Sequence, residues 1–135
     1  LLIGLPEIPS QRERYGEHFH QELLRGVARR LQQLVRPLDV LTRLDDRHFG
    51  VLTLIDDLRG CSPSSFKRLH EGLNLKAFKT GEGFISIKAG IAMVSLDASA
   101  LPVDPKRVIE QAEALLPDAY ATGRIVPLRY KQPVL

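Results

Sequence analysis

The clearest periodic pattern in the sequence lies between His18 and Val35. Apolar residues recur there at intervals of three and four and arginines fall between them, which indicates an amphipathic helix with one face in the core. Pro37 ends this helix, because the proline ring disfavours helical backbone in the residue before it. The apolar stripe consists of Phe19, Leu23, Val27, Leu31 and Leu34.

Short apolar runs predict the strands. Residues 1–5 are apolar and stop at Pro6, as in a buried strand. Residues 39–44 and 49–55 flank the charged turn "DDRH", which predicts a hairpin. Residues 84–93 alternate in polarity and are expected to form one strand, and residues 124–128 form the last.

Two further helices are indicated by their end signals. Residues 64–75 follow a Ser/Pro start, and Asp104 stands at a helix N-cap position with Pro105 as the first helical residue. Gly123 is expected to close this last helix in a left-handed conformation. Pro117 is expected to interrupt or kink it, because proline lacks a backbone donor. The resulting order of strands and helices predicts an α/β (α+β) domain with a mixed sheet flanked by helices.

Length and composition favour one compact domain. The chain has 135 residues, of which 44% are hydrophobic. No run approaches the roughly 18 apolar residues of a membrane span, and the first residues lack the charged-then-apolar order of a signal peptide, so no membrane contact is expected from this segment. Because the chain begins at Leu1 and its one methionine is Met93, we expect a segment of a longer protein. The tail at 131–135 then ends the domain or begins a linker.

The charged and the metal-ligating residues do not by themselves indicate a particular binding partner or metal site. The formal net charge is +3, with 13 arginines against 6 lysines. Arginine suits bidentate recognition of phosphate or guanine, although solvated helix faces explain the excess equally well. Aromatics are 6% and basic residues are scattered, so nucleic-acid binding is not expected. Cys61 is a lone cysteine, His18 and His20 point to different sides of a helix, and His48 stands alone; none predicts a metal site.

Three stretches resemble the GGDEF family, the bacterial domains that join two GTP molecules into cyclic di-GMP. They are "YGEHFHQELLRGVARRL" at 15–31, "RLDDRHFGVL" at 43–52 and "IEQAEALLPDAYATGRI" at 109–125. The resemblance covers residues 1–55 and 85–127, and it implies a GGDEF domain at 1–130. The implied fold is the nucleotidyl-cyclase palm-like fold, whose central sheet of about five strands is mixed and mainly antiparallel.

The signature of that family is replaced in this chain. Glycines in the signature let substrate phosphates approach the backbone, and its acids hold Mg²⁺ and support phosphoryl transfer. Adjacent aspartates on a turn with no third ligand indicate a solvated turn, so no Mg²⁺ site is expected. The five positions of the signature are occupied by Asp45, Asp46, Arg47, His48 and Phe49.

Other functional positions of the family are also changed. The resemblance places its metal-binding aspartate at Gly4 and its phosphate-binding lysine at Tyr120. Its two guanine-reading residues fall on Arg12 and Gln21, and only Arg124 keeps a phosphate-contacting type. Loss of these electrostatic contacts together implies a degenerate domain without cyclase activity.

An Arg-x-x-Asp motif, Arg36 and Asp39, precedes Asp45 with five residues between them. In the family this motif marks a regulatory site for cyclic di-GMP, in which the arginine forks onto guanine or phosphate and the aspartate accepts from guanine N1 and N2. A further basic residue, Lys67 or Arg68, is expected from the following helix.

The motif alone is weak. Chance predicts about 0.8 such pairs in this composition, and Arg43 with Asp46 is another. Asp39 can also bond local backbone amides, and Arg36 can favour the helix C-terminus.

Two functions remain open. The first is a catalytically inactive receptor for cyclic di-GMP. The second is a structural or dimerisation module that binds no nucleotide and regulates a neighbouring EAL phosphodiesterase, sensor or receiver domain. Retained GTP binding is a third, disfavoured by the lost guanine-reading residues. The resemblance implies a bacterial cytoplasmic domain, whether or not the full-length protein is tethered to the inner membrane.

Overall fold

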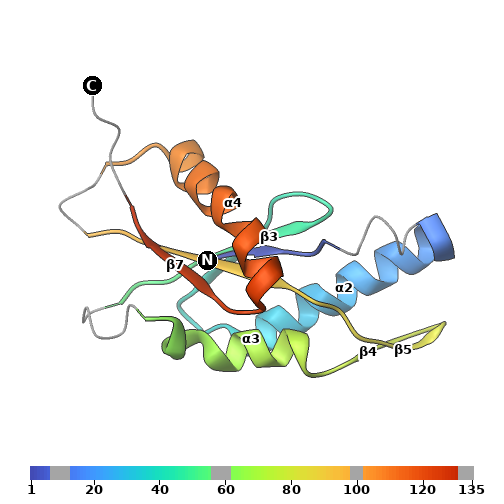
Figure 1. Ribbon diagram of the computed structural model, residues 1–135. Coiled ribbons are helices and arrows are strands. Elements are labelled where there is room, and N and C mark those ends of the chain that lie inside the picture. The colour runs from blue at the N-terminus through green and yellow to red at the C-terminus, as the bar shows by residue number, and fades with distance from the viewer. Residues whose placement is uncertain (7–12, 56–61, 98–101, 131–135) are drawn as a thin grey trace.

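The computed structural model describes residues 1–6, 13–55, 62–97 and 102–130. A five-stranded sheet forms its centre (Figure 1). Its strand order is β2-β3-β1-β6-β7. The pair β6–β7 is parallel and the other pairs are antiparallel, which confirms the mixed, mainly antiparallel sheet. The strands are β1 (Leu2–Gly4), β2 (Val40–Arg43), β3 (His48–Leu52), β6 (Gly90–Ser95) and β7 (Val126–Arg129).

Helices cover both faces of this sheet (Figure 1). The helix α2 (Glu17–Leu34) lies on one face with α3 (Lys67–Asn74), which the 3₁₀ turn η2 (Pro63–Phe66) precedes; α4 (Pro105–Thr122) lies on the other. Because successive strand side chains point to opposite faces, Ile3 packs into the core under α2 and Leu2 into the smaller core under α4. None of the described helices is long and apolar enough to cross a membrane.

The single strand expected over residues 84–93 is wrong. β5 (Gly83–Ile85) pairs with β4 (Phe78–Thr80), which was not predicted, in a separate two-stranded sheet; β6 begins only at Gly90. Between them, the Asn74 side chain binds the backbone of Ala89 with Oδ1 2.7 Å from N and Nδ2 3.3 Å from O. A side chain thus takes the place of a neighbouring strand. Apolar residues still alternate between the two strands, because Ile87 and Ala89 are buried although they belong to neither strand.

The expected interruption at Pro117 is also wrong, because α4 continues through it to Thr122. Leu116 and Ala119, on either side of the proline, are both buried against the sheet, and this packing holds the helix together where one backbone donor is missing. The end signals are confirmed: the Asp104 side chain accepts from Lys106 N at 3.0 Å, and Gly123 has φ 67°.

His20 is a buried polar side chain for which the described residues provide no hydrogen-bond partner. It is 2% exposed, and neither ring nitrogen has a hydrogen bond within the described part of the chain. Because an unsatisfied buried polar group costs about 1–3 kcal/mol, we expect His20→Leu to raise the free energy of unfolding by about 1 kcal/mol in urea denaturation. His18→Leu is the control, since the His18 side chain is 90% exposed. Equal effects of the two changes would contradict the explanation.

Candidate functional site

Arg36 and Asp39 face each other across the turn between α2 and β2. Asp39 Oδ2 accepts a hydrogen bond from the Arg36 backbone N at 2.8 Å, and Arg36 O accepts one from Asp39 N at 3.0 Å. Arg36 Nη2 also lies 3.3 Å from Asp39 Oδ1. The Asp39 side chain is 7% exposed, whereas that of Arg36 is 57% exposed. Asp39 therefore does bond the local backbone, and Arg36 offers its guanidinium at the surface.

Thr53 joins this pair from the residue after β3. Its hydroxyl donates to Asp39 Oδ1 at 2.6 Å and accepts a hydrogen bond from Arg36 Nη2, which also donates to Leu54 O at 3.0 Å. Burial alone would raise the pKa of Asp39, but the hydrogen bonds from Thr53 and Arg36 and the Arg36 charge hold it below its ordinary value. Sequence reasoning missed Thr53, whose signal was a lone hydroxyl inside the apolar run at 51–55.

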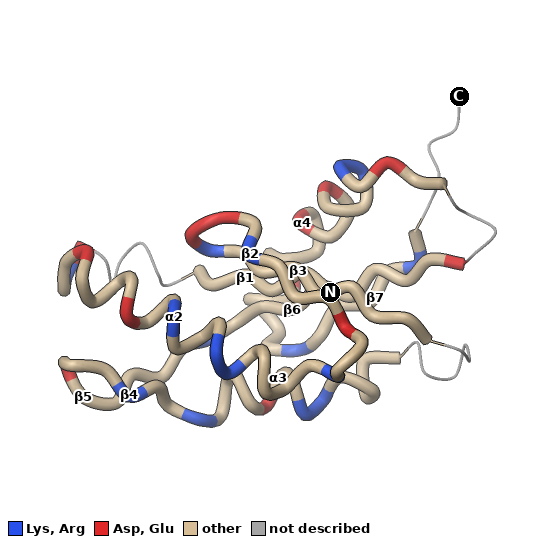
Figure 2. Tube along the Cα trace, turned by 180° about the vertical axis from the view of Figure 1, so that it is seen from behind, with Lys and Arg blue, Asp and Glu red and all other residues tan. Residues whose placement is uncertain are grey.

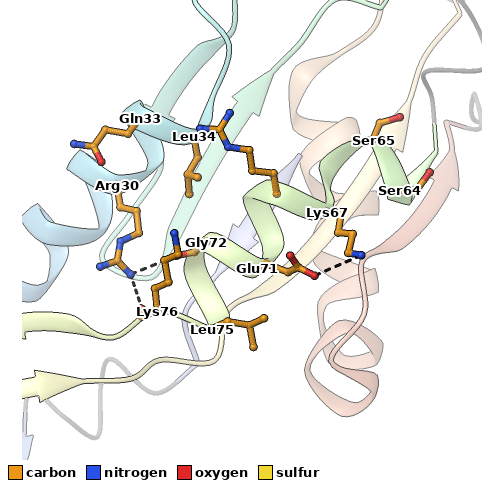
Figure 3. Close-up of a pocket in the computed structure, with 11 residues that line it drawn as sticks. Arg30, Gln33, Leu34, Ser64, Ser65, Lys67, Glu71, Gly72, Leu75 and Lys76 are labelled. Atoms are coloured by element: carbon orange, nitrogen blue, oxygen red, sulfur yellow. Dashed lines mark hydrogen bonds and ion pairs between the residues drawn. The ribbon is translucent and has the colours of Figure 1, made fainter.

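A small cavity brings a third cationic residue to the pair. Arg36, Asp39 and Arg68 line the same space of about 260 Å³, together with apolar residues such as Leu1 and Phe66. Of the two basic residues expected from the following helix, Arg68 reaches this cavity. Lys67 does not line it and instead lies 3.8 Å from Glu71 Oε1, as Figure 3 shows.

Arg68 also lines a larger groove of about 830 Å³ between α2 and α3. Arg30 and Lys76 stand on one side of this groove and Lys67 on the other (Figure 3). The small cavity and the groove therefore share one arginine.

The turn at residues 45–48, where the resemblance places the family signature, has both of its aspartates in contact with neighbouring side chains or backbone. Asp45 accepts from Arg47 N at 2.7 Å and lies 2.8 Å from His48 Nδ1, while Arg43 Nη2 lies 2.9 Å from Asp46 Oδ1. Burial acts to raise the pKa of Asp45, but the Arg47 and His48 contacts lower it below its usual value. No group of three or more His, Cys, Asp or Glu residues placed to hold a metal occurs in residues 1–6, 13–55, 62–97 and 102–130.

Tyr120 lies across two glycines that face each other in the sheet. Gly4 of β1 pairs directly with Gly90 of β6. A Cβ atom on Gly4 would lie 2.1 Å from the Tyr120 hydroxyl, and one on Gly90 would lie 2.5 Å from its ring. Burial raises the pKa of Tyr120, against a lowering effect of the Arg47 charge. Tyr120 therefore fills the space that side chains at these two positions would need.

This tyrosine also lines a hollow of about 460 Å³ beside the replaced signature, with Asp45, Arg47, His48 and Glu113. The structure thus brings Tyr120, where the resemblance places the family's phosphate-binding lysine, to the turn at residues 45–48. The contact of Tyr120 with Gly4 leaves no signal in the sequence, because the two residues lie on separate elements far apart in the chain.

The remaining sequence candidates lie elsewhere. Gln21 donates to Glu17 on α2 at 2.9 Å and does not line the hollow beside the signature. Arg124 lines a different hollow, next to Lys67 and His70. Arg12 and Cys61 lie outside the described residues.

The comparisons with known proteins settle the family. The sequence model described as "Diguanylate cyclase, GGDEF domain" matches residues 1–125 of the chain. The chain belongs to the GGDEF family. No curated protein matches this GGDEF domain.

Solved GGDEF structures share its fold at low sequence identity. The diguanylate cyclase SiaD from Pseudomonas aeruginosa, solved with its activator SiaC, is 15% identical, with a TM-score of 0.70. The alignment covers 96% of this chain and 48% of SiaD, so the chain spans about half of that protein. An EAL/GGDEF domain protein from M. capsulatus is 21% identical, with a TM-score of 0.69 and coverage of 97% of this chain and 83% of that one.

The GGDEF domain of DgcB from Caulobacter crescentus was solved in complex with c-di-GMP. It is 14% identical, with a TM-score of 0.67, and the alignment covers 95% of this chain and 74% of that one. These similarities confirm the palm-like GGDEF fold with a mixed five-stranded sheet flanked by helices.

Proposed function

We propose that this GGDEF domain is a catalytically inactive receptor that binds cyclic di-GMP through Arg36, Asp39 and Arg68. The observation that carries the proposal is that Arg68, at the start of α3, lines one cavity with Arg36 and Asp39, which precede the β2–β3 hairpin in the chain. Two guanidinium groups beside one carboxylate match the acceptors of guanine and phosphate and the donors of the guanine N1 and N2 edge.

The absence of catalysis is proposed from the replaced signature turn. Phosphoryl transfer in the family needs carboxylates that hold Mg²⁺, and the resemblance places one of them at Gly4, which has no side chain. The Tyr120 hydroxyl fills the space beside Gly4, and Asp45 is engaged by Arg47 and His48. We therefore propose that no Mg²⁺ is bound there and that GTP is not turned over.

Ligand binding at the Arg36 site requires a local rearrangement. Arg36 Nη2 is bound to Thr53 and Leu54, so the guanidinium has to release at least one of these contacts to fork onto guanine. The cavity of about 260 Å³ is small for a dinucleotide, and the adjoining groove of about 830 Å³ gives room for the rest of the ligand. Arg68 lies where these spaces meet, which suits a phosphate contact.

Isothermal titration calorimetry of the chain with cyclic di-GMP tests the proposal. We expect a dissociation constant in the micromolar range, about −8 kcal/mol, with GTP as the control ligand giving much weaker binding. Incubation with GTP and Mg²⁺, followed by chromatography, is expected to yield no cyclic di-GMP. A flat titration at millimolar ligand would remove the receptor function, and product formation would remove the inactivity.

A second candidate function is a structural module that regulates a neighbouring domain, such as the EAL domain that the M. capsulatus protein carries with its GGDEF domain. The observation that favours it is that the Asp39 carboxylate already accepts hydrogen bonds from the Arg36 backbone and the Thr53 hydroxyl, so the pair has partners without a ligand. In this alternative, Arg36 only stabilises the turn between α2 and β2 and contacts no ligand. A chain that binds no nucleotide but loses stability on Arg36→Ala would support it.

A further inference from the structure

We propose that the groove between α2 and α3 docks an acidic, amphipathic segment of a partner protein, and that this segment competes with the nucleotide for Arg68. The docking part stands on the groove itself. The competition rests on the proposed receptor function, and the experiment below separates the two.

The groove is basic and open. Its volume is about 830 Å³, and its charged lining residues are Arg30, Lys67, Arg68 and Lys76 against Glu71. Figure 2 shows the same imbalance along the C-terminal half of α2, α3 and the connection to β4, where red segments are sparse. A concave surface with one sign of charge favours a partner of the opposite sign.

The basic side chains of the groove differ in whether they already have hydrogen-bond or ion-pair partners within the protein. Arg30 donates to Gly72 O at 3.3 Å and to Lys76 O (Figure 3). It also donates to Ala77 O at 2.8 Å, and its Cζ lies 3.6 Å from the centroid of the Phe78 ring, so its side chain is held in place at the edge of the groove. Lys67 has Glu71 as its partner. The side chains of Arg68 and Lys76 make no hydrogen bond or ion pair with any residue that the structure describes. These two positive charges are therefore available to a ligand.

An apolar element accompanies the free charges. Leu75, at the end of α3, is 75% exposed and lines the groove with Leu34. Leu34 lies so close to Gly72 that a Cβ atom there would be 2.7 Å from a leucine methyl group, which brings the two helices together under the groove. Exposed leucine beside unpaired cations matches a segment with acidic and apolar side chains on one face.

Other classes of partner fit this groove less well. Single-stranded nucleic acid is held by aromatic side chains that stack on bases, and the groove lining contains none. A membrane surface favours a flat or convex amphipathic face, whereas this surface is hollow. A small anion alone leaves the exposure of Leu75 unexplained.

Arg68 couples the groove to the nucleotide site. It lines both the groove and the cavity of Arg36 and Asp39. One guanidinium cannot make its full set of hydrogen bonds to a carboxylate of the partner and to the nucleotide at once, and the part of the nucleotide that extends into the groove occupies the same space as the partner. Binding at either place therefore lowers affinity at the other, and by linkage the two effects are equal in free energy. Nucleotide binding would in this way release the partner.

Docking is tested by fluorescence anisotropy with a labelled helical peptide that carries glutamates and leucines on one face. Lys76→Glu is expected to weaken peptide binding about 10-fold. The matched control is Lys79→Glu, an exposed lysine on β4 that does not line the groove, with a change below about 2-fold. Leu75→Ser is expected to weaken binding and Phe84→Ser is not, although both side chains are 75% exposed. No binding, or equal effects within either pair, overturns the docking site.

The competition is tested by adding cyclic di-GMP to the same peptide complex. Displacement of the peptide by the nucleotide supports the competition, and weaker binding of both the peptide and the nucleotide in Arg68→Ala supports the shared arginine. Nucleotide binding in calorimetry without displacement overturns it. If calorimetry shows no nucleotide binding while the peptide still depends on Lys76 and Leu75, the docking site stands and the receptor function fails.

Discussion

Arg36→Ala is expected to lower the affinity for cyclic di-GMP about 100-fold in isothermal titration calorimetry. The guanidinium is the exposed member of the pair, and its removal leaves guanine or phosphate acceptors of the ligand without a partner. It also leaves the buried Asp39 carboxylate with fewer donors, so the melting temperature has to be measured beside the affinity. Arg36→Lys, which keeps the charge but not the fork, is expected to bind weakly as well.

The chain provides a matched control for this change. Arg43 and Asp46 form the other Arg-x-x-Asp pair, with the same spacing and a direct contact of 2.9 Å, but they lie on the signature hairpin and do not line the cavity of Arg68. Arg43→Ala is therefore expected to leave the affinity within about 2-fold of the wild type. If both changes weaken binding equally, position in the fold does not distinguish the two pairs, and the proposed site is wrong.

The sheet and its helices were predictable because their signals are local and mutually consistent. The stripe from Phe19 to Leu34 defined α2, and Asp104, Pro105 and Gly123 marked the ends of α4. The break before Gly90 was not predictable, because it depends on Asn74 binding the Ala89 backbone across a sequence separation of 15 residues. Pro117 was misjudged for a related reason: burial of its neighbours in the folded protein outweighs a local preference.

The candidate site divides in the same way. The spacing of Arg36 and Asp39 could be read from the sequence, and so could a basic residue on the next helix, but only the fold selects Arg68 over Lys67. Thr53 and the contact of Tyr120 with Gly4 are tertiary and leave no spacing to find. Chemistry carried by neighbours in sequence is predictable; chemistry assembled from separate strands and helices is not.

Gly90→Ala is expected to reduce the free energy of unfolding by about 1–3 kcal/mol, because the added methyl group overlaps the Tyr120 ring. In a Tyr120→Ala background the same change is expected to cost less than about 0.5 kcal/mol, since the space is then free. Urea denaturation of the four proteins in this double-mutant cycle measures the coupling.

Gly50→Ala is the control for the effect of alanine in a strand, because its Cβ atom would be 3.4 Å from Thr42, an ordinary contact. It is expected to change stability little in either background. The cycle bears directly on the proposed inactivity: a coupling energy near zero would mean that Tyr120 does not lie over Gly4 and Gly90. The space beside the signature would then be open to a substrate and a metal ion, and the main steric reason for inactivity would be lost.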